Sequence, residues 1–278
     1  MQKLGLIAGG GDLPITIAEY CRDAGRPYFV LRLKGFADPA LQAFPGAEAG
    51  LAELGKAFGL LRGAGCEAVC FAGNVKRPDF AALKPDLRGL RSLPDALMAA
   101  SKGDDALLRF VLGEFEREGF AVEGPEVVFA GLRIGAGVLG AIGPGAEHGP
   151  DIDLALRVVE TLGALDIGQA AVVAGGLVLA VEAQEGTDAM LARCIDLPAP
   201  LKGMAGARLG VLIKWPKPGQ DRRVDLPVVG VKTIEAAAAV GLAGIVVQAD
   251  QALVLDKDAV RAAADRLGLF VVGLAARA

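Results

Sequence analysis

The fold is decided by residues 4–33, LGLIAGGGDLPITIAEYCRDAGRPYFVLRL. The apolar run Leu4–Ala8 predicts a buried strand, and three glycines follow it at the turn into a predicted helix, Leu13–Ala24. Pro14 is compatible with the first turn of that helix, because the first backbone N–H groups of a helix have no partner within it. Tyr28–Leu33 predicts the next strand. A strand, a glycine turn, a helix and a strand in this order are typical of a parallel α/β sheet of Rossmann-like type.

The alternation of strand and helix continues along the first half of the chain. Leu51–Ala64 predicts a helix, Glu67–Ala72 predicts a strand, and Asp105–Glu118 predicts a further helix with its apolar residues at helical spacing. Either Asp104 or Asp105 could cap that helix, since aspartate is a favoured N-cap residue. We therefore expect the first half to be a doubly wound α/β domain.

A domain boundary is indicated by the glycine-dense stretch 131–137. We expect a Rossmann-like domain over residues 1–132 and a mixed α/β catalytic domain over residues 133–278. In the second half, two apolar runs meet at Gly175-Gly176, which is a strong hairpin signal. The other elements predicted there are Asp151–Leu165, Thr187–Cys194 with Thr187 as its cap, Val211–Lys214, Thr233–Val240, Gly244–Gln248, Leu253–Leu255, Asp256–Leu267 and Leu269–Leu274.

Composition limits the class of protein. The chain has 278 residues, of which 53% are hydrophobic and 22% charged, and this balance is typical of a globular protein with two domains. Its net charge of −4 gives no global attraction to nucleic acid. The opening sequence MQKLGLIAGG leads into a strand rather than a signal peptide, and no apolar stretch approaches the ~20 residues of a spanning helix, so we expect a cytoplasmic protein. The cysteines lack zinc-type spacing and are expected to be reduced thiols of the core: Cys21, Cys66, Cys70 and Cys194.

Charged residues concentrate in the stretch 214–230, KWPKPGQDRRVDLPVVG, which lies between two apolar runs. Its three prolines exclude a helix interior or a central strand, so the stretch is expected to be a stiff loop. Cations beside the carboxylates of Asp221 and Asp225 suit a phosphate-bearing ligand together with a divalent metal. A salt-bridged surface loop is the alternative.

Two glycine-containing loops follow predicted strands of the first half. The backbone amides of Gly9–Gly11 could hold a phosphate at the start of a helix, although a tight turn that needs positive φ accounts for these glycines equally well. The spacing is not G-x-G-x-x-G, which argues against a nicotinamide cofactor. The loop GNVKRPDF, residues 73–80, leaves the carboxyl end of a strand, so Asn74, Lys76 and Arg77 are expected to share a crevice with the first loop. A solvated loop is the alternative.

Acidic residues lie within and just before the segment EGTD, residues 185–188. Glu182, Glu185 and Asp188 could supply the oxygen ligands that a hard cation needs. The alternative is a helix capped by Thr187 with acids in its first turn, which explains Asp188 but not an acid at the end of an apolar strand.

Four segments together resemble one family: GLIAGGGDLP, GNVKRPDF, EGTDAMLARC and KWPKPGQDRRVDLPVVG. The family is the magnesium-dependent UDP-2,3-diacylglucosamine pyrophosphatase of lipid A biosynthesis, the type unrelated to the calcineurin-like phosphoesterases. The resemblance extends over nearly the whole chain. It implies two domains with the ligand cleft between them. It also implies hydrolysis of the diphosphate to UMP and 2,3-diacylglucosamine 1-phosphate (lipid X), by metal-assisted attack of water on the β-phosphorus.

The resemblance also implies roles for individual residues. Asp225 matches the essential aspartate of the family, and Asp221 and Asp188 are candidates for sharing Mg²⁺ with it. With Lys214, Asp225 and Asp221 form the implied catalytic set. Substrate contacts are expected from Gly10, Gly11, Asp12, Asn74, Lys76, Arg77, Thr187, Lys217, Gln220, Arg222 and Arg223. The partners implied are UDP-2,3-diacylglucosamine and its lipid product, while peripheral contact with the inner membrane and a homodimer stay open. A non-catalytic binding protein for a nucleotide-sugar or acyl ligand is the alternative function.

Overall fold

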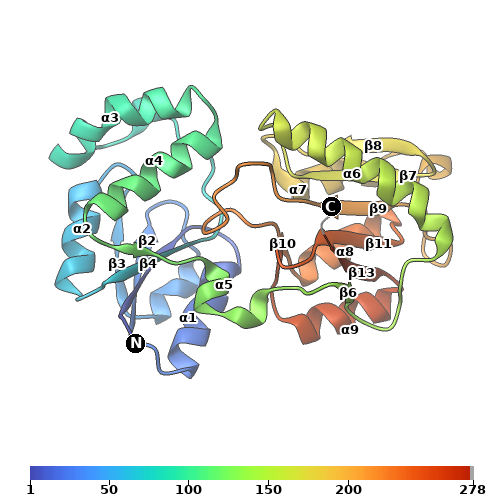
Figure 1. Ribbon diagram of the computed structural model, residues 1–278, viewed down its shortest axis with the longest axis horizontal. Coiled ribbons are helices and arrows are strands. Elements are labelled where there is room, and N and C mark those ends of the chain that lie inside the picture. The colour runs from blue at the N-terminus through green and yellow to red at the C-terminus, as the bar shows by residue number, and fades with distance from the viewer. Residues whose placement is uncertain (276–278) are drawn as a thin grey trace. The chain divides into compact units, whose positions relative to one another are not determined.

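The chain folds into two compact units in the computed structural model, which describes residues 1–275. The first unit comprises Met1–Gly131 together with Asp221–Val224 (Figure 1). The second unit comprises Leu132–Gln220 and the chain from Asp225 onward. The stretch after residue 214 therefore contributes to both units, since the chain returns to the first unit for residues 221–224 only.

The first unit is built on a parallel sheet with the strand order β3-β2-β1-β4-β5. β1 is its central strand and is buried along its whole length, because helices cover both faces of such a sheet. The order agrees with that of doubly wound nucleotide-binding sheets. The strands are β1 (Leu4–Ala8), β2 (Tyr28–Leu33), β3 (Gly46–Ala49), β4 (Ala68–Ala72) and β5 (Ala121–Val122).

Helices and a small aromatic cluster complete the first unit. Phe58, Phe115 and Phe120 pack together between the helices and the sheet, with ring centroids 5.0 Å apart for Phe58 and Phe115. The helices are α1 (Leu13–Asp23), α2 (Leu54–Gly63), α3 (Leu87–Ala100), α4 (Asp104–Arg117) and α5 (Pro125–Val128). Short 3₁₀ turns lie at η1 (Pro39–Ala43), η2 (Phe80–Ala82) and η3 (Ala130–Leu132).

The second unit is built on a mixed sheet with the order β6-β13-β11-β9-β7-β8. β9, β11 and β13 are parallel, whereas β7 runs antiparallel to β9 and forms a hairpin with β8. Gly175 and Gly176 make the hairpin turn at φ 57° and 77°, a region that favours glycine. The strands are β6 (Gly137–Val138), β7 (Ala170–Ala174), β8 (Leu177–Val181), β9 (Val211–Lys214), β11 (Gly244–Gln248) and β13 (Phe270–Leu274), and β10 (Val228–Val229) pairs with β12 (Leu253–Val254).

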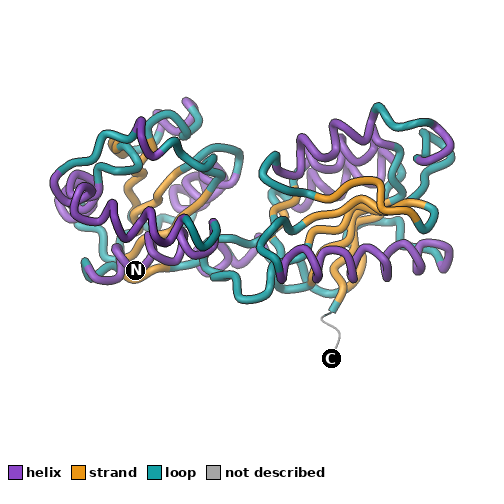
Figure 2. The backbone as a smooth tube through the Cα atoms, turned by 90° about the horizontal axis from the view of Figure 1, so that it is seen from above, coloured by secondary structure: helices purple, strands orange, loops and turns teal. Residues whose placement is uncertain are grey.

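Helices lie on both faces of the second sheet, as Figure 2 shows. α6 packs on β7 and β9 over one apolar cluster, and α7, α8 and α9 enclose another. The helices are α6 (Gly149–Ala164), α7 (Gly186–Ile195), α8 (Val231–Val240) and α9 (Lys257–Leu267), with 3₁₀ turns η4 (Ala146–His148) and η5 (Ala199–Leu201).

The predicted fold class is confirmed, because a parallel α/β unit precedes a mixed α/β unit. The predicted cap of the helix near residue 104 was wrong. α4 begins at Asp104 with Gly103 as its N-cap residue, so neither Asp104 nor Asp105 caps it. Glycine occupies this position because φ there is 124°.

All four cysteines are free and buried, as predicted. No helix within the described part of the chain is long and apolar enough to cross a bilayer.

Candidate active site

Strand β9 carries a lysine into the interior of the second unit. Lys214 is the last residue of this strand and is only 8% exposed. Its ammonium donates a hydrogen bond to the carbonyl oxygen of Val228 at 2.8 Å. A buried cation is costly unless other groups compensate its charge, so its surroundings must supply negative charge.

Three carboxylates supply that charge. Burial lowers the pKa of the Lys214 ammonium, while the negative charges of Glu182, Asp188 and Asp225 act in the opposite direction and offset part of the effect. All four residues belong to the second unit. The structure therefore brings Asp188 and Asp225 to one buried ammonium, although 36 residues separate them in the chain.

Glu182 is the most buried of these carboxylates, at 7% exposure. One of its oxygens accepts a hydrogen bond from the Thr187 hydroxyl at 2.6 Å, and the other accepts one from the backbone N–H of Gln169 at 3.0 Å. These two hydrogen bonds fix the orientation of the Glu182 carboxylate. The predicted capping role of Thr187 was wrong: Glu185 is the N-cap residue of α7, and the Thr187 hydroxyl binds Glu182 instead.

The segment after β9 places a second lysine in an ion pair. The Lys217 ammonium lies 2.6 Å from a carboxylate oxygen of Asp166, so its charge is already balanced within the second unit. The side-chain oxygen of Gln220 accepts the Lys217 backbone N–H at 2.8 Å. Its amide nitrogen is buried and has no hydrogen-bond partner in the described structure. Gln220 thus retains a donor that an incoming acceptor could use.

The next four residues belong to the first unit, where Arg223 forms a compact ionic cluster. Its guanidinium lies 2.7 Å from an oxygen of Asp221 and 2.6 Å from Glu116. The hydrogen bond from Arg223 lowers the pKa of the Asp221 carboxyl and raises that of the guanidinium. Both oxygens of Asp221 are engaged by Arg223, so the structure assigns these two predicted site residues to each other. Arg222 is exposed and takes part in no ion pair of residues 1–275.

The Asp221–Arg223 pair predicts a pH dependence of stability. Because the folded-state pKa of Asp221 is lowered, its contribution is present above the ordinary value of 3.8 and is lost as the pH falls through the folded-state pKa. Arg223→Gln should lower the free energy of unfolding by about 1 kcal/mol at neutral pH, a small value because the arginine is partly exposed. Urea unfolding between neutral pH and pH 3 should show this difference shrinking with acid. Arg222→Gln is the matched control, and an equal loss in both variants would contradict the pairing.

The two glycine-containing loops of the first unit meet. Gly10 and Asn74 form an antiparallel bridge, with backbone N–H to O distances of 2.9 Å in both directions. A Cβ atom on Gly9 would lie 2.7 Å from the Asn74 carbonyl oxygen, so close backbone approach requires glycine there. The loops thus meet through the backbones of Gly10 and Asn74, while a crevice shared with Lys76 and Arg77 stays a prediction. The amides of Gly9 and Gly10, however, donate to Ala72 and Asn74 and are not bare.

The remaining candidates of the first unit differ in their surroundings. Gly11 has φ 85° and, with Asp12, is exposed at the start of α1. Lys76 is exposed, whereas Arg77 is bound to Asp104 at 2.9 Å and to the carbonyl oxygen of Ala100. Arg77 is therefore anchored to the junction of α3 and α4.

No group of three or more His, Cys, Asp or Glu side chains suited to a metal gathers anywhere in residues 1–275. Asp221 belongs to the first unit and is bound to Arg223, whereas Asp188 and Asp225 belong to the second, so the metal set of these three residues stays a prediction. The sequence did not predict the ion-pair partners of two candidate residues, which are Glu116 for Arg223 and Asp166 for Lys217. It showed Glu182 as an acid in an apolar strand, which is the signal that a compensating cation lies nearby.

Comparison with known proteins assigns both halves of the chain. Residues 3–132 match the family model described as the LpxI N-terminal domain, and residues 135–272 match the LpxI C-terminal domain. The UDP-2,3-diacylglucosamine pyrophosphatase LpxI of Caulobacter vibrioides (strain ATCC 19089 / CIP 103742 / CB 15) is 60% identical over 274 residues, which is 99% of this chain and 98% of that protein. Among solved structures, CobK precorrin-6A reductase aligns with a TM-score of 0.34 at 14% identity, over 100% of this chain and 89% of that one.

Proposed function

The chain belongs to the LpxI family, and from this premise we propose that it hydrolyses the diphosphate of UDP-2,3-diacylglucosamine, yielding UMP and 2,3-diacylglucosamine 1-phosphate. The observation that carries the proposal is the buried Lys214 at the carboxyl end of β9, whose ammonium is influenced by the negative charges of Glu182, Asp188 and Asp225. Ligands of α/β proteins bind at that end of parallel strands.

The residues present fit a magnesium ion if the protein supplies only part of its ligands. Mg²⁺ retains waters and is commonly bound by one or two carboxylates together with substrate phosphates. Asp188 and Asp225 act on the same ammonium and would hold the ion. When bound, Mg²⁺ would neutralise charge on the diphosphate and polarise its phosphoryl oxygens.

The chain's own residues would position the reacting groups. A water oxygen forms a bond to the β-phosphorus while the bond from that phosphorus to the UMP oxygen breaks, and UMP leaves with the bonding electron pair. Asp225 would orient the water and accept its proton. The unpartnered amide of Gln220 would donate to phosphate oxygens.

Lys214 would act as a positioning residue rather than a phosphate ligand. Its ammonium is buried, binds the Val228 carbonyl oxygen and balances Glu182. It would therefore hold Asp188 and Asp225 in place and moderate the repulsion between their charges. With the lysine present, the carboxylates of Asp188 and Asp225 would repel each other less in the absence of a bound metal ion.

Phosphorus NMR of the purified chain with UDP-2,3-diacylglucosamine tests the reaction and its metal requirement together. We expect UMP and the sugar 1-phosphate to appear in equal amounts with Mg²⁺, to stop appearing in excess chelator, and to reappear when Mg²⁺ is restored. A thermal shift with substrate but no product would support the non-catalytic alternative. Undiminished turnover in chelator would overturn the metal requirement but leave the hydrolysis intact.

A further inference from the structure

The outer face of α3 exposes a row of large apolar side chains. A helix places residues 100° apart, so positions 87, 90, 94, 97 and 98 fall on one side. The buried residues of α3, which include Ser92 and Ala100, lie on the opposite side, where the helix packs on α2 and α4. The exposed apolar side chains are Leu87 at 80%, Leu90 at 56%, Leu97 at 44% and Met98 at 55%. Because these side chains stay exposed to solvent, they do not stabilise the unit by burial, and an exposed apolar patch of this kind is typical of a binding surface.

Basic side chains border this apolar row. Lys84 precedes α3, Arg91 lies on it and Lys102 follows it; all three are exposed, and none takes part in the ion pairs of residues 1–275. The segment 84–102 contains four basic and two acidic residues, whereas the whole chain has a net charge of −4. Asp86 accepts backbone hydrogen bonds at the start of α3. Asp95 is therefore the one acidic side chain on the exposed side of this described segment.

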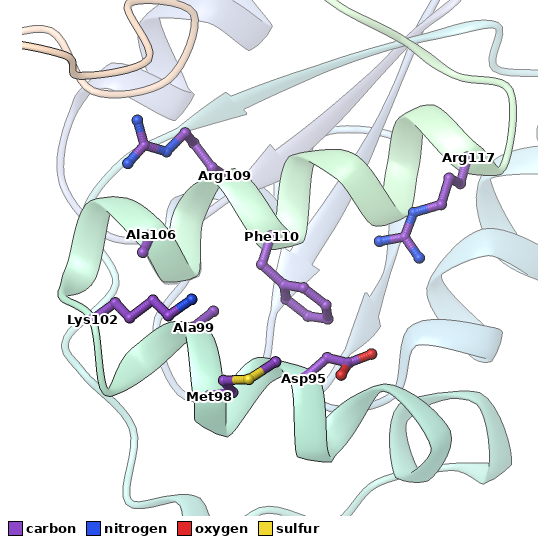
Figure 3. A pocket seen from close by; sticks show the side chains of 8 residues that line it. All are labelled: Asp95, Met98, Ala99, Lys102, Ala106, Arg109, Phe110 and Arg117. Carbon is purple, nitrogen blue, oxygen red and sulfur yellow. The ribbon is translucent and has the colours of Figure 1, made fainter.

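The groove between α3 and α4 also combines apolar and basic side chains. It forms a cavity of about 340 Å³ whose apolar lining includes Met98, Ala106 and Phe110. Lys102, Arg109 and Arg117 add positive charge to its lining and Asp95 adds one carboxylate, while Arg109 is paired with Asp105 and Arg117 with Glu114. Figure 3 shows the Phe110 ring of α4 directed toward α3. An apolar floor with three basic side chains and one acidic side chain around it suits an anionic amphiphile.

We propose that the outer face of α3 is a docking surface for an anionic lipid bilayer. The helix would lie in the plane of the interface, with its leucines and Met98 at the acyl boundary and Lys84, Arg91 and Lys102 on lipid phosphates. A second copy of the chain is the poorer partner, because pairing two such faces would bring like charges together. The inference goes beyond the proposed reaction and uses none of its residues.

Sedimentation of the full chain with vesicles tests this surface. We expect binding to phosphatidylcholine vesicles that contain phosphatidylglycerol, weak binding to phosphatidylcholine alone, and loss of binding at high salt. Leu90→Gln with Leu97→Gln should weaken binding by at least about 10-fold, because two exposed apolar anchors are removed. Arg91→Glu should weaken it by more than about 5-fold, since each cation near an anionic surface contributes about that factor.

Matched variants in the second unit serve as controls. Leu165→Gln removes a leucine that is 66% exposed, and Arg157→Glu reverses an exposed arginine, so neither should change vesicle binding. Asp225→Ala should bind vesicles like the unmodified chain, which separates docking from catalysis. Equal binding by the α3 variants and the controls would overturn the proposal. So would a dimer in analytical ultracentrifugation that the leucine variants dissociate without any change in vesicle binding, because the face would then join two copies.

Discussion

Asp225→Ala is expected to lower kcat on the order of 1,000-fold while leaving the fold intact. Asp225 is half-buried and acts on the Lys214 ammonium together with Asp188. Removing its carboxylate deletes both the group proposed to orient water and half of the proposed protein ligands for Mg²⁺. The loss should appear in kcat more than in substrate affinity, because Asp225 is proposed to act at the diphosphate and not on the diacylglucosamine or uridine part. Initial rates of UMP release and substrate binding at equilibrium measure the two separately.

Two further variants make this result specific. Asp225→Asn keeps the shape of the side chain and removes its charge, so it should lose nearly as much activity as the alanine variant. Asp196→Asn removes an exposed carboxylate in the same unit, at the end of α7, and should keep the activity of the unmodified chain. Retention of more than about a tenth of kcat in both Asp225 variants would exclude the assigned role.

Lys214→Met is expected to destabilise the second unit by about 1–3 kcal/mol, because the Val228 carbonyl oxygen loses its hydrogen-bond donor and the nearby carboxylates lose a compensating charge. Methionine keeps an apolar stem of similar length, so the packing of β9 changes little. The buried carboxylate of Glu182 loses its cation, and the charges of Asp188 and Asp225 lose their neighbour. Urea unfolding followed by the fluorescence of Trp215, the chain's single tryptophan, reports on this region directly.

A double-mutant cycle tests the physical reason for that loss. Glu182→Gln removes the unpaired charge, so Lys214→Met combined with Glu182→Gln should be more stable than the sum of the single changes predicts, by more than about 1 kcal/mol. Activity should remain low in the double variant, because Asp188 and Asp225 still lack their positioning cation. Strict additivity of the two changes would show that Lys214 and Glu182 are not coupled.

Elements with a strong local signal were predictable from the sequence. β1, β2, β9 and β11 have the bounds predicted for them, because each is a short apolar run ended by glycine, a charge or a turn. The hairpin at Gly175-Gly176 followed from the turn geometry that only glycine adopts readily. α3 was not predicted, since Pro94 lies within it and its outer leucines remain exposed.

The candidate site was predictable in its residue types but only partly in its contacts. Sequence identified Lys214, Asp188 and Asp225 as candidates, and all three belong to the second unit, where both carboxylates influence the pKa of the Lys214 ammonium. Asp221 and Arg223 were grouped with them because they are adjacent in the chain, yet they form their own ion pair with Glu116 in the first unit. Distance along a proline-rich loop does not specify which unit each side chain joins.

The sequence by itself determined the two α/β units and the family, since local periodicity and whole motifs record these properties, and it predicted the carboxylate on which the proposed chemistry chiefly depends. Only the tertiary structure decided which charges compensate one another. In the tertiary structure Thr187 donates a hydrogen bond to Glu182 and does not cap α7. Lys217 forms an ion pair with Asp166, and Lys214 is buried. The physical reason is that burial sets the cost of an uncompensated charge, and burial depends on segments far apart in the chain.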